Sequence, residues 1–476
     1  MNSFSVAIGQ WWLVDSPLDR VSGVIDWKFV DDRLTWTLLL DGSLPDPNEP
    51  GYSEGRTLHG ITSAGKLTLM HAHPVGPFTH RTGFGERALE HISQTWEGFT
   101  LLQGDHVTDV DLFTRASFTT SHLWDWIGPS RLNQLASERR RVSLEEPGPW
   151  LEADLGDDRK LALATYENRI FGRTKRSSDT YGMYQLHAPN GMRVEEIRDL
   201  AFRLTSLHAI VMDTPSDVQE LTFGETAEKD VVIEINPRRP GSEDQPGELH
   251  DPLFDTWEIG FPHFIQRWLE LTSKSRHLMS AATPRKNGMT VESMLIETCN
   301  GLESLAEVAL TAPGLRQADQ ETLEKLKAAG LNSAERRDYK NYLEQRRWTL
   351  QDRLVALAET LGEESAEWLF GAPLSNWAGA VSRLRNALTH GAPLRNDLMN
   401  DFEFVGSAEQ STTLLLRLAL LKHVGYANQR SDSPDELLRS NGRRVAGHPN
   451  SRLFNECRSL ARYAGRWHEW HDRLER

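Results

Sequence analysis

The sequence predicts an α+β protein of two or more domains, β-rich at its N-terminal end and all-α at its C-terminal end. At 476 residues the chain exceeds the roughly 250–300 residues at which single hydrophobic cores stop growing. Alternating, β-rich runs occupy most of roughly the first 190 residues, whereas apolar residues recur every three to four positions after a Pro-, Gly- and acid-rich loop at 238–252. The change of period indicates strands first and helices afterwards.

The strand-like runs of the N-terminal region are separated by Gly, Pro and Asp, as in a sandwich or barrel-like fold. They lie at 21–30, 34–42, 56–62, 65–73 and 107–120, and two more lie at 218–223 and 230–236. One amphipathic helix is predicted at 193–211, because apolar residues there have the helical spacing, namely Val194, Ile197, Ala201, Leu204 and Leu207.

Helical periodicity continues from residue 261 to the C-terminus. It predicts helices at 261–282, 291–310, 334–362, 372–391, 408–426 and 451–476. We therefore expect a β-rich region at 1–255, a connecting helix within 256–285 and a helical domain with a basic C-terminal extension at 286–476.

The composition is typical of a folded protein that stays in water, with 38% hydrophobic and 25% charged residues. The longest strongly apolar stretch, 414–421, is interrupted by Arg417 and is much shorter than the ~20 residues of a membrane span. The first residues lack the pattern of a signal peptide. The two cysteines, Cys299 and Cys457, are too few for a disulfide framework or a thiolate zinc site. We expect a cytoplasmic protein without a membrane partner.

The formal charge of -15 is distributed unevenly. Residues 284–476 contain 26 basic and 26 acidic side chains, so residues 1–283 carry all of the net charge. Within 439–466 there are seven arginines and a single acid, Glu456. This asymmetry favours a polyanionic partner for the C-terminal part alone, although two domains with different solvated surfaces would show it as well.

Histidines on neighbouring strands raise the question of a metal site in the N-terminal region. His71 and His73 project from the same face of one strand, with His59, Asp105 and His106 as available companions. Strand-surface histidines without cysteine or an H-E-x-x-H helix are more often ordinary surface residues. We therefore predict no metal and no cofactor. The tryptophans of this region are expected in its core rather than along a ligand groove.

The helix at 372–391 combines an apolar stripe with a polar constellation. Arg385, Asn386 and His390 lie off the stripe, and Gly391 and Pro393 place His390 in the last helical turn. A histidine with an arginine about one turn away is suited to acid–base chemistry on a phosphate. The stripe itself consists of residues spaced four, three and four apart, namely Trp377, Val381, Leu384 and Leu388.

The spacing between Arg385 and His390 is not informative by itself. It also occurs in three other pairs, Arg203/His208, Arg443/His448 and Arg466/His471. Of the four arginines, Arg385 is the one followed by Asn within a helix that ends directly after the histidine. Context therefore singles out Arg385, Asn386 and His390.

The segment 385–390 matches the R-N-x-x-x-H form of the HEPN motif, and the run of helices around it resembles a HEPN bundle. The whole chain resembles the ApeA-like bacterial proteins, which join a β-rich N-terminal domain to a C-terminal HEPN domain. The segments 59–69 and 121–128, and the helix from 193 followed by strands, carry this wider resemblance.

The resemblance implies a metal-independent endoribonuclease of antiphage or abortive-infection defence, with tRNA as the expected RNA. Attack by the neighbouring 2'-OH would give 2',3'-cyclic phosphate ends. His390 would be the general acid/base, Arg385 would stabilise charge on the phosphate oxygens, and Asn386 would orient His390 or the phosphate. HEPN motifs of two subunits commonly meet in one cleft, which implies a homodimer. The β-rich region would be a sensor or regulator for a phage-encoded trigger or a nucleotide ligand.

The arginine-rich extension offers candidates for RNA docking. Arg458, Arg462 and Arg466 have i,i+4 spacing, and we expect them to form a row that follows the phosphates, with Trp467 stacking on a base. Arg443 and Arg444, in the preceding loop-like segment, are further RNA-binding candidates. Alternatively, this is a solvated cationic face that pairs with acidic residues of the chain or its dimer mate. For the whole protein the rival to an enzyme is a ligand- or protein-binding dimer with a HEPN-like bundle as its platform.

Overall fold

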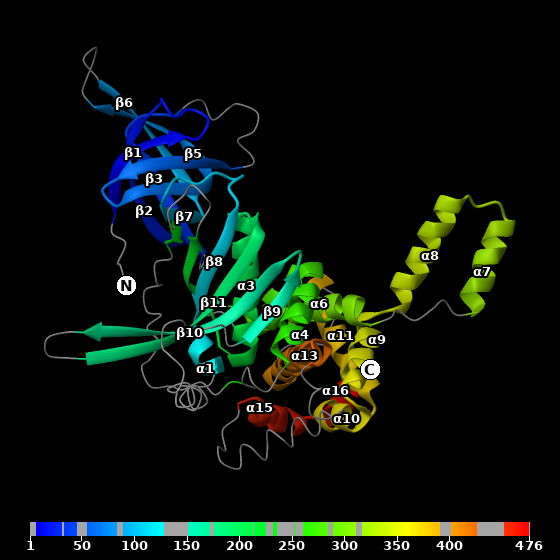
Figure 1. Cartoon of the computed structure of the whole chain (residues 1–476). Coiled ribbons are helices and arrows are strands. Elements are labelled where there is room, and N and C mark those ends of the chain that lie inside the picture. Colours follow the sequence, from blue (N-terminus) through cyan, green and yellow to red (C-terminus); the bar gives the residue numbers. More distant parts are fainter. Residues whose placement is uncertain are drawn as a thin grey trace. The chain divides into compact units, whose positions relative to one another are not determined.

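The computed structural model describes residues 6–30, 33–44, 55–82, 89–127, 151–171, 176–212, 214–224, 232–235, 252, 260–283, 289–310, 317–390, 401–425 and 452–475. The chain divides into two compact units, residues 1–205 with 216–250, and residues 206–215 with 251–476. The first is rich in strands and the second in helices, which confirms the predicted α+β class (Figure 1).

Thirteen strands of the described residues form one sheet, in the order β4-β1-β2-β3-β6-β5-β7-β13-β12-β8-β11-β10-β9. Short helix α1 (Leu123–Ile127) follows β8, and α3 (Val194–Met212) follows β11. The strands are β1 (Ala7–Leu13), β2 (Val21–Val30), β3 (Arg33–Leu40), β4 (Arg56–Thr62), β5 (Gly65–Thr82), β6 (Leu89–Gly98), β7 (Thr100–Gly104), β8 (Phe113–Thr120), β9 (Leu151–Gly156), β10 (Arg159–Phe171), β11 (Arg176–Met192), β12 (Val218–Gly224) and β13 (Val232–Glu234).

Six of these strands close into a barrel. β1 pairs with β2 and β4, β2 with β3, and β3 with β6, while β5 pairs with both β6 and β4. Their inward-facing side chains form an apolar core in which Trp11, Trp36 and Trp96 are fully buried. This core placement agrees with the expectation for the tryptophans, since closure leaves the ring of strands without an open edge.

The remaining strands extend the sheet from β5. β7 continues the line of β6 along β5, and β13, β12 and β8 follow in antiparallel pairing. The strand predicted at 107–120 was too long, because β8 begins only at Phe113. The preceding residues form a turn in which the Asp111 carboxylate accepts hydrogen bonds from the backbone N–H and the hydroxyl of Thr108.

The second unit consists of helices, in which α6 and α9 pack against each other and each also packs against α11 and α13. No helix among the described residues is long and apolar enough to cross a membrane. The helices are α4 (Phe261–Lys274), α5 (Arg276–Ala282), α6 (Val291–Ala309), α7 (Gln317–Ala328), α8 (Ser333–Arg347), α9 (Leu350–Thr360), α10 (Glu363–Phe370), α11 (Leu374–His390), α13 (Phe402–His423), α15 (Arg452–Ala461) and α16 (Arg466–Glu475).

Three predicted helices are each divided in two. Ser275 is extended, at φ -151° and ψ 109°, and separates α4 from α5. α8 ends at Arg347, and Thr349 caps α9. The Thr349 hydroxyl accepts from the backbone N–H of Asp352, and the Asp352 carboxylate accepts from the backbone N–H of Thr349. A turn at 462–465 separates α15 from α16. Apolar spacing continued across these breaks, so periodicity alone did not detect them.

Candidate active site

Helix α11 carries the predicted trio, Arg385, Asn386 and His390, and buries most of its apolar stripe. Trp377, Val381 and Leu384 are fully buried, whereas Leu388 is only partly buried. The Trp377 ring stacks on Phe370 with centroids 4.3 Å apart, and its indole N–H donates to the Ser411 hydroxyl at 2.9 Å. These contacts set the rotation of α11, and the polar residues on its other faces are thereby directed away from the centre of the bundle.

The Arg385 side chain is held by three groups. One terminal nitrogen, Nη2, donates to the Glu303 carboxylate at 3.1 Å and to Asn300 Oδ1 at 3.3 Å. The other, Nη1, donates to Asn386 Oδ1 at 3.3 Å. Only 18% of the Arg385 side chain is exposed. Arg385 is therefore a fixed cation beside the end of α11 rather than a mobile surface group.

A second arginine shares the same carboxylate. Arg353, in the first turn of α9, places Nη1 3.6 Å from the other oxygen of Glu303 and Nη2 3.0 Å from Glu307. The Arg353 guanidinium also lies over the Trp348 ring, 5.1 Å from its centroid. Two arginines and two glutamates thus form one network across α6, α9 and α11, in which the formal charges cancel.

His390 occupies the last residue of α11 and is exposed. Among the described residues it has no hydrogen-bond or ion-pair partner. Asn386 lies one turn before it and is exposed as well, and its amide oxygen is used by Arg385. The predicted trio thus shares one region of α11, with the arginine anchored and the histidine open.

Sequence reasoning missed Asn300, Glu303 and Arg353. The signal that would have found two of them is their spacing on α6, since Asn300, Glu303 and Glu307 are separated by three and four residues and so share one helix face. Cys299 lies beside them but is buried, and burial raises the pKa of its thiol to about 12, which makes it a poor nucleophile.

The other pairs with the same spacing have different surroundings. His208 is fully buried, as expected for a core histidine, and Arg203 forms an ion pair with Asp199. The Arg443/His448 pair lies outside the described residues.

The Arg466/His471 pair fixes helix α16 to its neighbours. Arg466 forms an ion pair with Glu403 of α13, which raises the pKa of the guanidinium, and lies over the Trp470 ring at 4.8 Å. A Cβ added at Gly379 of α11 would lie 3.1 Å from the His471 ring. Glycine therefore permits the close approach of α16 to α11, and the pair serves packing.

The predicted basic row is wrong in its geometry. Arg458 belongs to α15, Arg462 lies in the turn after it, and Arg466 begins α16, so the three do not line one helix face. Arg458 and Arg462 are exposed. Arg443 and Arg444 lie outside the described residues.

Trp467 does not offer its ring to a base. It is 1% exposed, with its ring centroid 4.9 Å from that of Trp470 and 6.4 Å from that of Phe404. The expectation of stacking is corrected, because the apolar face of α16 uses this tryptophan to pack against α13.

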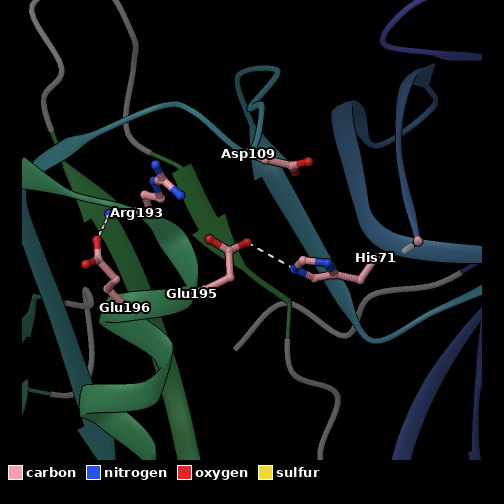
Figure 2. A pocket seen from close by; sticks show the side chains of 6 residues that line it. His71, Asp109, Arg193, Glu195 and Glu196 are labelled. Carbon is pink, nitrogen blue, oxygen red and sulfur yellow. Dashed lines mark hydrogen bonds and ion pairs between the residues drawn. The ribbon is translucent and has the colours of Figure 1, made fainter. Parts of the chain in front are cut away.

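A polar pocket of about 670 Å³ lies in the N-terminal unit. His71 stands at a bulge between β4 and β5 with φ 52°, and its Nε2 lies 3.0 Å from Glu195 at the start of α3 (Figure 2). This hydrogen bond raises the pKa of His71 and lowers that of Glu195. The lining residues are Gly55, His71, Asp109, Arg193, Glu195 and Glu196. Three carboxylates beside one arginine and one histidine make the pocket electrostatically unfavourable for the phosphates of a nucleotide.

Two of the other candidate metal ligands, His59 and His106, have structural contacts. His59 and His106 stack with ring centroids 4.5 Å apart, and each lies within 3.0 Å of a backbone carbonyl oxygen. Within the described part of the chain, no group of three or more His, Cys, Asp or Glu side chains could hold a metal ion.

Comparison with protein families agrees with this architecture. The model for ApeA N-terminal domain 1 matches residues 7–268, and the model for Apea-like HEPN matches residues 296–430. The chain belongs to the ApeA-like HEPN family. Neither the curated proteins nor the solved structures gave a match. The HEPN match contains Arg385, Asn386 and His390, and also Asn300, Glu303 and Arg353 of the network. Membership indicates, in general terms, an RNA-binding nuclease with a role in antiphage defence.

Proposed function

We propose that this ApeA-like chain is a metal-independent endoribonuclease that cleaves tRNA or another structured RNA in antiphage or abortive-infection defence. The observation that carries the proposal is the end of α11, where an exposed His390 follows an arginine fixed by its neighbours. An immobilised cation and an accessible imidazole are the groups that acid–base cleavage of a phosphodiester requires.

In the proposed reaction the ribose 2'-oxygen attacks the adjacent phosphorus and gives up its proton to a general base. The bond from phosphorus to the 5'-oxygen breaks, and that oxygen takes a proton from a general acid. The products are a 2',3'-cyclic phosphate and a 5'-OH. His390 serves as acid or base, and Arg385 stabilises the charge that develops on the non-bridging oxygens.

One chain supplies one histidine to this site, whereas the reaction uses a base and an acid in succession. Two copies of α11 that face each other would supply both groups. A homodimer with a shared cleft is therefore part of the proposal, as is a regulatory role for the β-rich region towards a phage-encoded trigger or ligand.

The direct test is to incubate the purified protein with total RNA in EDTA and map the new ends. Wild type should release fragments with 2',3'-cyclic phosphate, and His390→Ala should not. His468→Ala is the matched control, because His468 is 69% exposed and lies on α16, outside the trio. A requirement for divalent metal would refute the mechanism.

One observation supports the rival function, a ligand- or protein-binding platform. The Arg385 guanidinium is engaged by Glu303 and Asn300, as a purely structural arginine would be. If wild type cleaves no RNA even when expressed in phage-infected cells, the rival gains support. Analytical ultracentrifugation of the same sample would test the dimer separately.

A further inference from the structure

Glu303 is the centre of the charged network beside α11. Its Oε2 accepts from Arg385 at 3.1 Å, and its Oε1 lies 3.6 Å from Nη1 of Arg353. Each carboxylate oxygen therefore faces a different arginine, one from α11 and one from α9. The side chains of Arg385, Arg353 and Glu303 are 18%, 13% and 27% exposed, so solvent screens these charges only in part.

The network determines the orientation of the Arg385 guanidinium. An arginine side chain has many rotamers, and holding one of them requires contacts at its nitrogens. Here Glu303 and Asn300 fix Nη2 from α6 and Asn386 fixes Nη1 from α11. Of these three partners Glu303 is the one that is charged, and hydrogen bonds to an ionised acceptor are about twice as strong as neutral ones.

Glu303 is itself anchored. Arg353 cannot easily leave it, because Arg353 is also paired with Glu307 at 3.0 Å and lies over the Trp348 ring. The capped start of α9 places Arg353 in the first helical turn, where the backbone is held by Thr349. The cap of α9 thus fixes Arg353, Arg353 fixes Glu303, and Glu303 fixes the guanidinium of Arg385.

We propose that Glu303 is a positioning residue for the reaction, acting through Arg385, and that Arg353 keeps the Glu303 carboxylate in place. This inference rests on the proposed ribonuclease function. Since Arg385 acts on charge that develops in the transition state, loss of its orientation lowers kcat and leaves KM nearly unchanged. If the Glu303 carboxylate only competed with RNA for Arg385, its removal would instead raise kcat or leave it unchanged, because the cation would be free for RNA.

The test compares kcat and KM of the full-length protein on one defined RNA. Glu303→Gln keeps the shape and an acceptor oxygen but removes the charge, and Glu303→Ala removes both. We expect kcat to fall about 10- to 100-fold in Glu303→Gln and further in Glu303→Ala, with KM within about twofold. Glu297→Gln is the control, since Glu297 lies on the same helix and bonds to Ser280 instead.

Arg353→Gln provides a second route that leaves Glu303 and Arg385 intact. It should lower kcat by less than Glu303→Gln, because it removes only the anchor of the carboxylate. A double-mutant cycle on unfolding, with Glu303→Gln and Arg385→Gln, should show that the two substitutions are coupled, and this readout requires no activity.

The outcomes separate the two claims. Cleavage by wild type with equal or higher kcat in Glu303→Gln overturns the positioning role and leaves the ribonuclease function standing. An unchanged kcat in Arg353→Gln overturns the part assigned to Arg353. If wild type does not cleave RNA, the proposed function and the positioning role both fail, whatever the unfolding cycle shows. A fall of kcat with unchanged KM, together with coupling in the cycle, supports the proposal.

Discussion

The end of α11 and the start of α16 have the same Arg-x4-His spacing but opposite surroundings. At α11 the arginine is tied to α6 and the histidine is exposed at the helix end. At α16 the arginine pairs with α13, and the histidine lies against Gly379 of α11. Both arginines are anchored, so anchoring does not distinguish them. The two histidines differ, because His390 is exposed and His471 lies against a neighbouring helix.

We expect the two pairs to contribute differently to the protein. The α16 pair joins helices, and its loss should reduce stability. The α11 pair presents an accessible imidazole at a helix end, and its loss should reduce activity. Substitutions at the two places should therefore have separable effects on cleavage and on unfolding.

The largest expected effect is on cleavage. His390→Ala should lower the rate of RNA cleavage by about 10²–10⁴-fold, the usual contribution of a general acid or base. His471→Ala should stay within about threefold of wild type, because His471 acts in packing. Initial rates on a single RNA measure both. Equal losses of cleavage rate in the two variants would contradict the functional difference between the two Arg/His pairs.

Trp467→Ala should have the largest effect on stability, because the ring is buried between Trp470 and Phe404. We expect a loss of about 3–5 kcal/mol in the free energy of unfolding, measured by denaturant titration. Trp368, 41% exposed on α10, is the control, and its replacement by Ala should cost about 0.5 kcal/mol. A stable Trp467→Ala protein with weakened RNA binding would restore the stacking role.

Arg466→Ala should cost about 1 kcal/mol of unfolding free energy. The ion pair with Glu403 is half exposed and contributes little, and the contact with the Trp470 ring adds a similar amount. High salt should reduce the difference from wild type. Arg462→Ala, in the exposed turn, should change unfolding by less. A larger loss of unfolding free energy in Arg462→Ala than in Arg466→Ala would show that Arg466 is not the residue that holds α16 in place.

The smallest expected effect is on the pH dependence of stability. It concerns His71 of the other unit, whose pKa is raised by Glu195. Since the pKa of His71 is raised from 6.5, the pair stabilises the fold below that value and loses this contribution as pH rises through the higher folded pKa. The lowered pKa of Glu195 keeps the carboxylate charged at and above its ordinary 4.5.

The Glu195→Gln variant should therefore differ most from wild type in melting temperature near about pH 5.5 and least above about pH 8. Because both side chains are over one-third exposed, the contribution should be well under about 1 kcal/mol. Melting curves across this pH range provide the measurement. A difference that does not change with pH would show that the pair is not charged in the folded protein.

Local patterns predicted several elements closely. The strands at 21–30 and 56–62 have the predicted bounds. The helix predicted at 193–211 is shifted by one residue at each end, and the helix predicted at 291–310 ends one residue earlier. Each has a single clear period and clear end signals. The helix breaks at Ser275 and Thr349 were missed, because apolar spacing continued on both sides of them.

The sequence by itself predicted a β-rich part followed by a helical part and the face of α11 that is buried, and it singled out Arg385, Asn386 and His390 as candidates, because these follow from local period and residue type. Tertiary structure alone decided that β5 closes a barrel, that Trp467 is buried, and that Glu303 of α6 meets both Arg385 of α11 and Arg353 of α9. Those contacts join residues tens of positions apart in the chain, and their geometry depends on how whole helices and strands pack rather than on any local pattern.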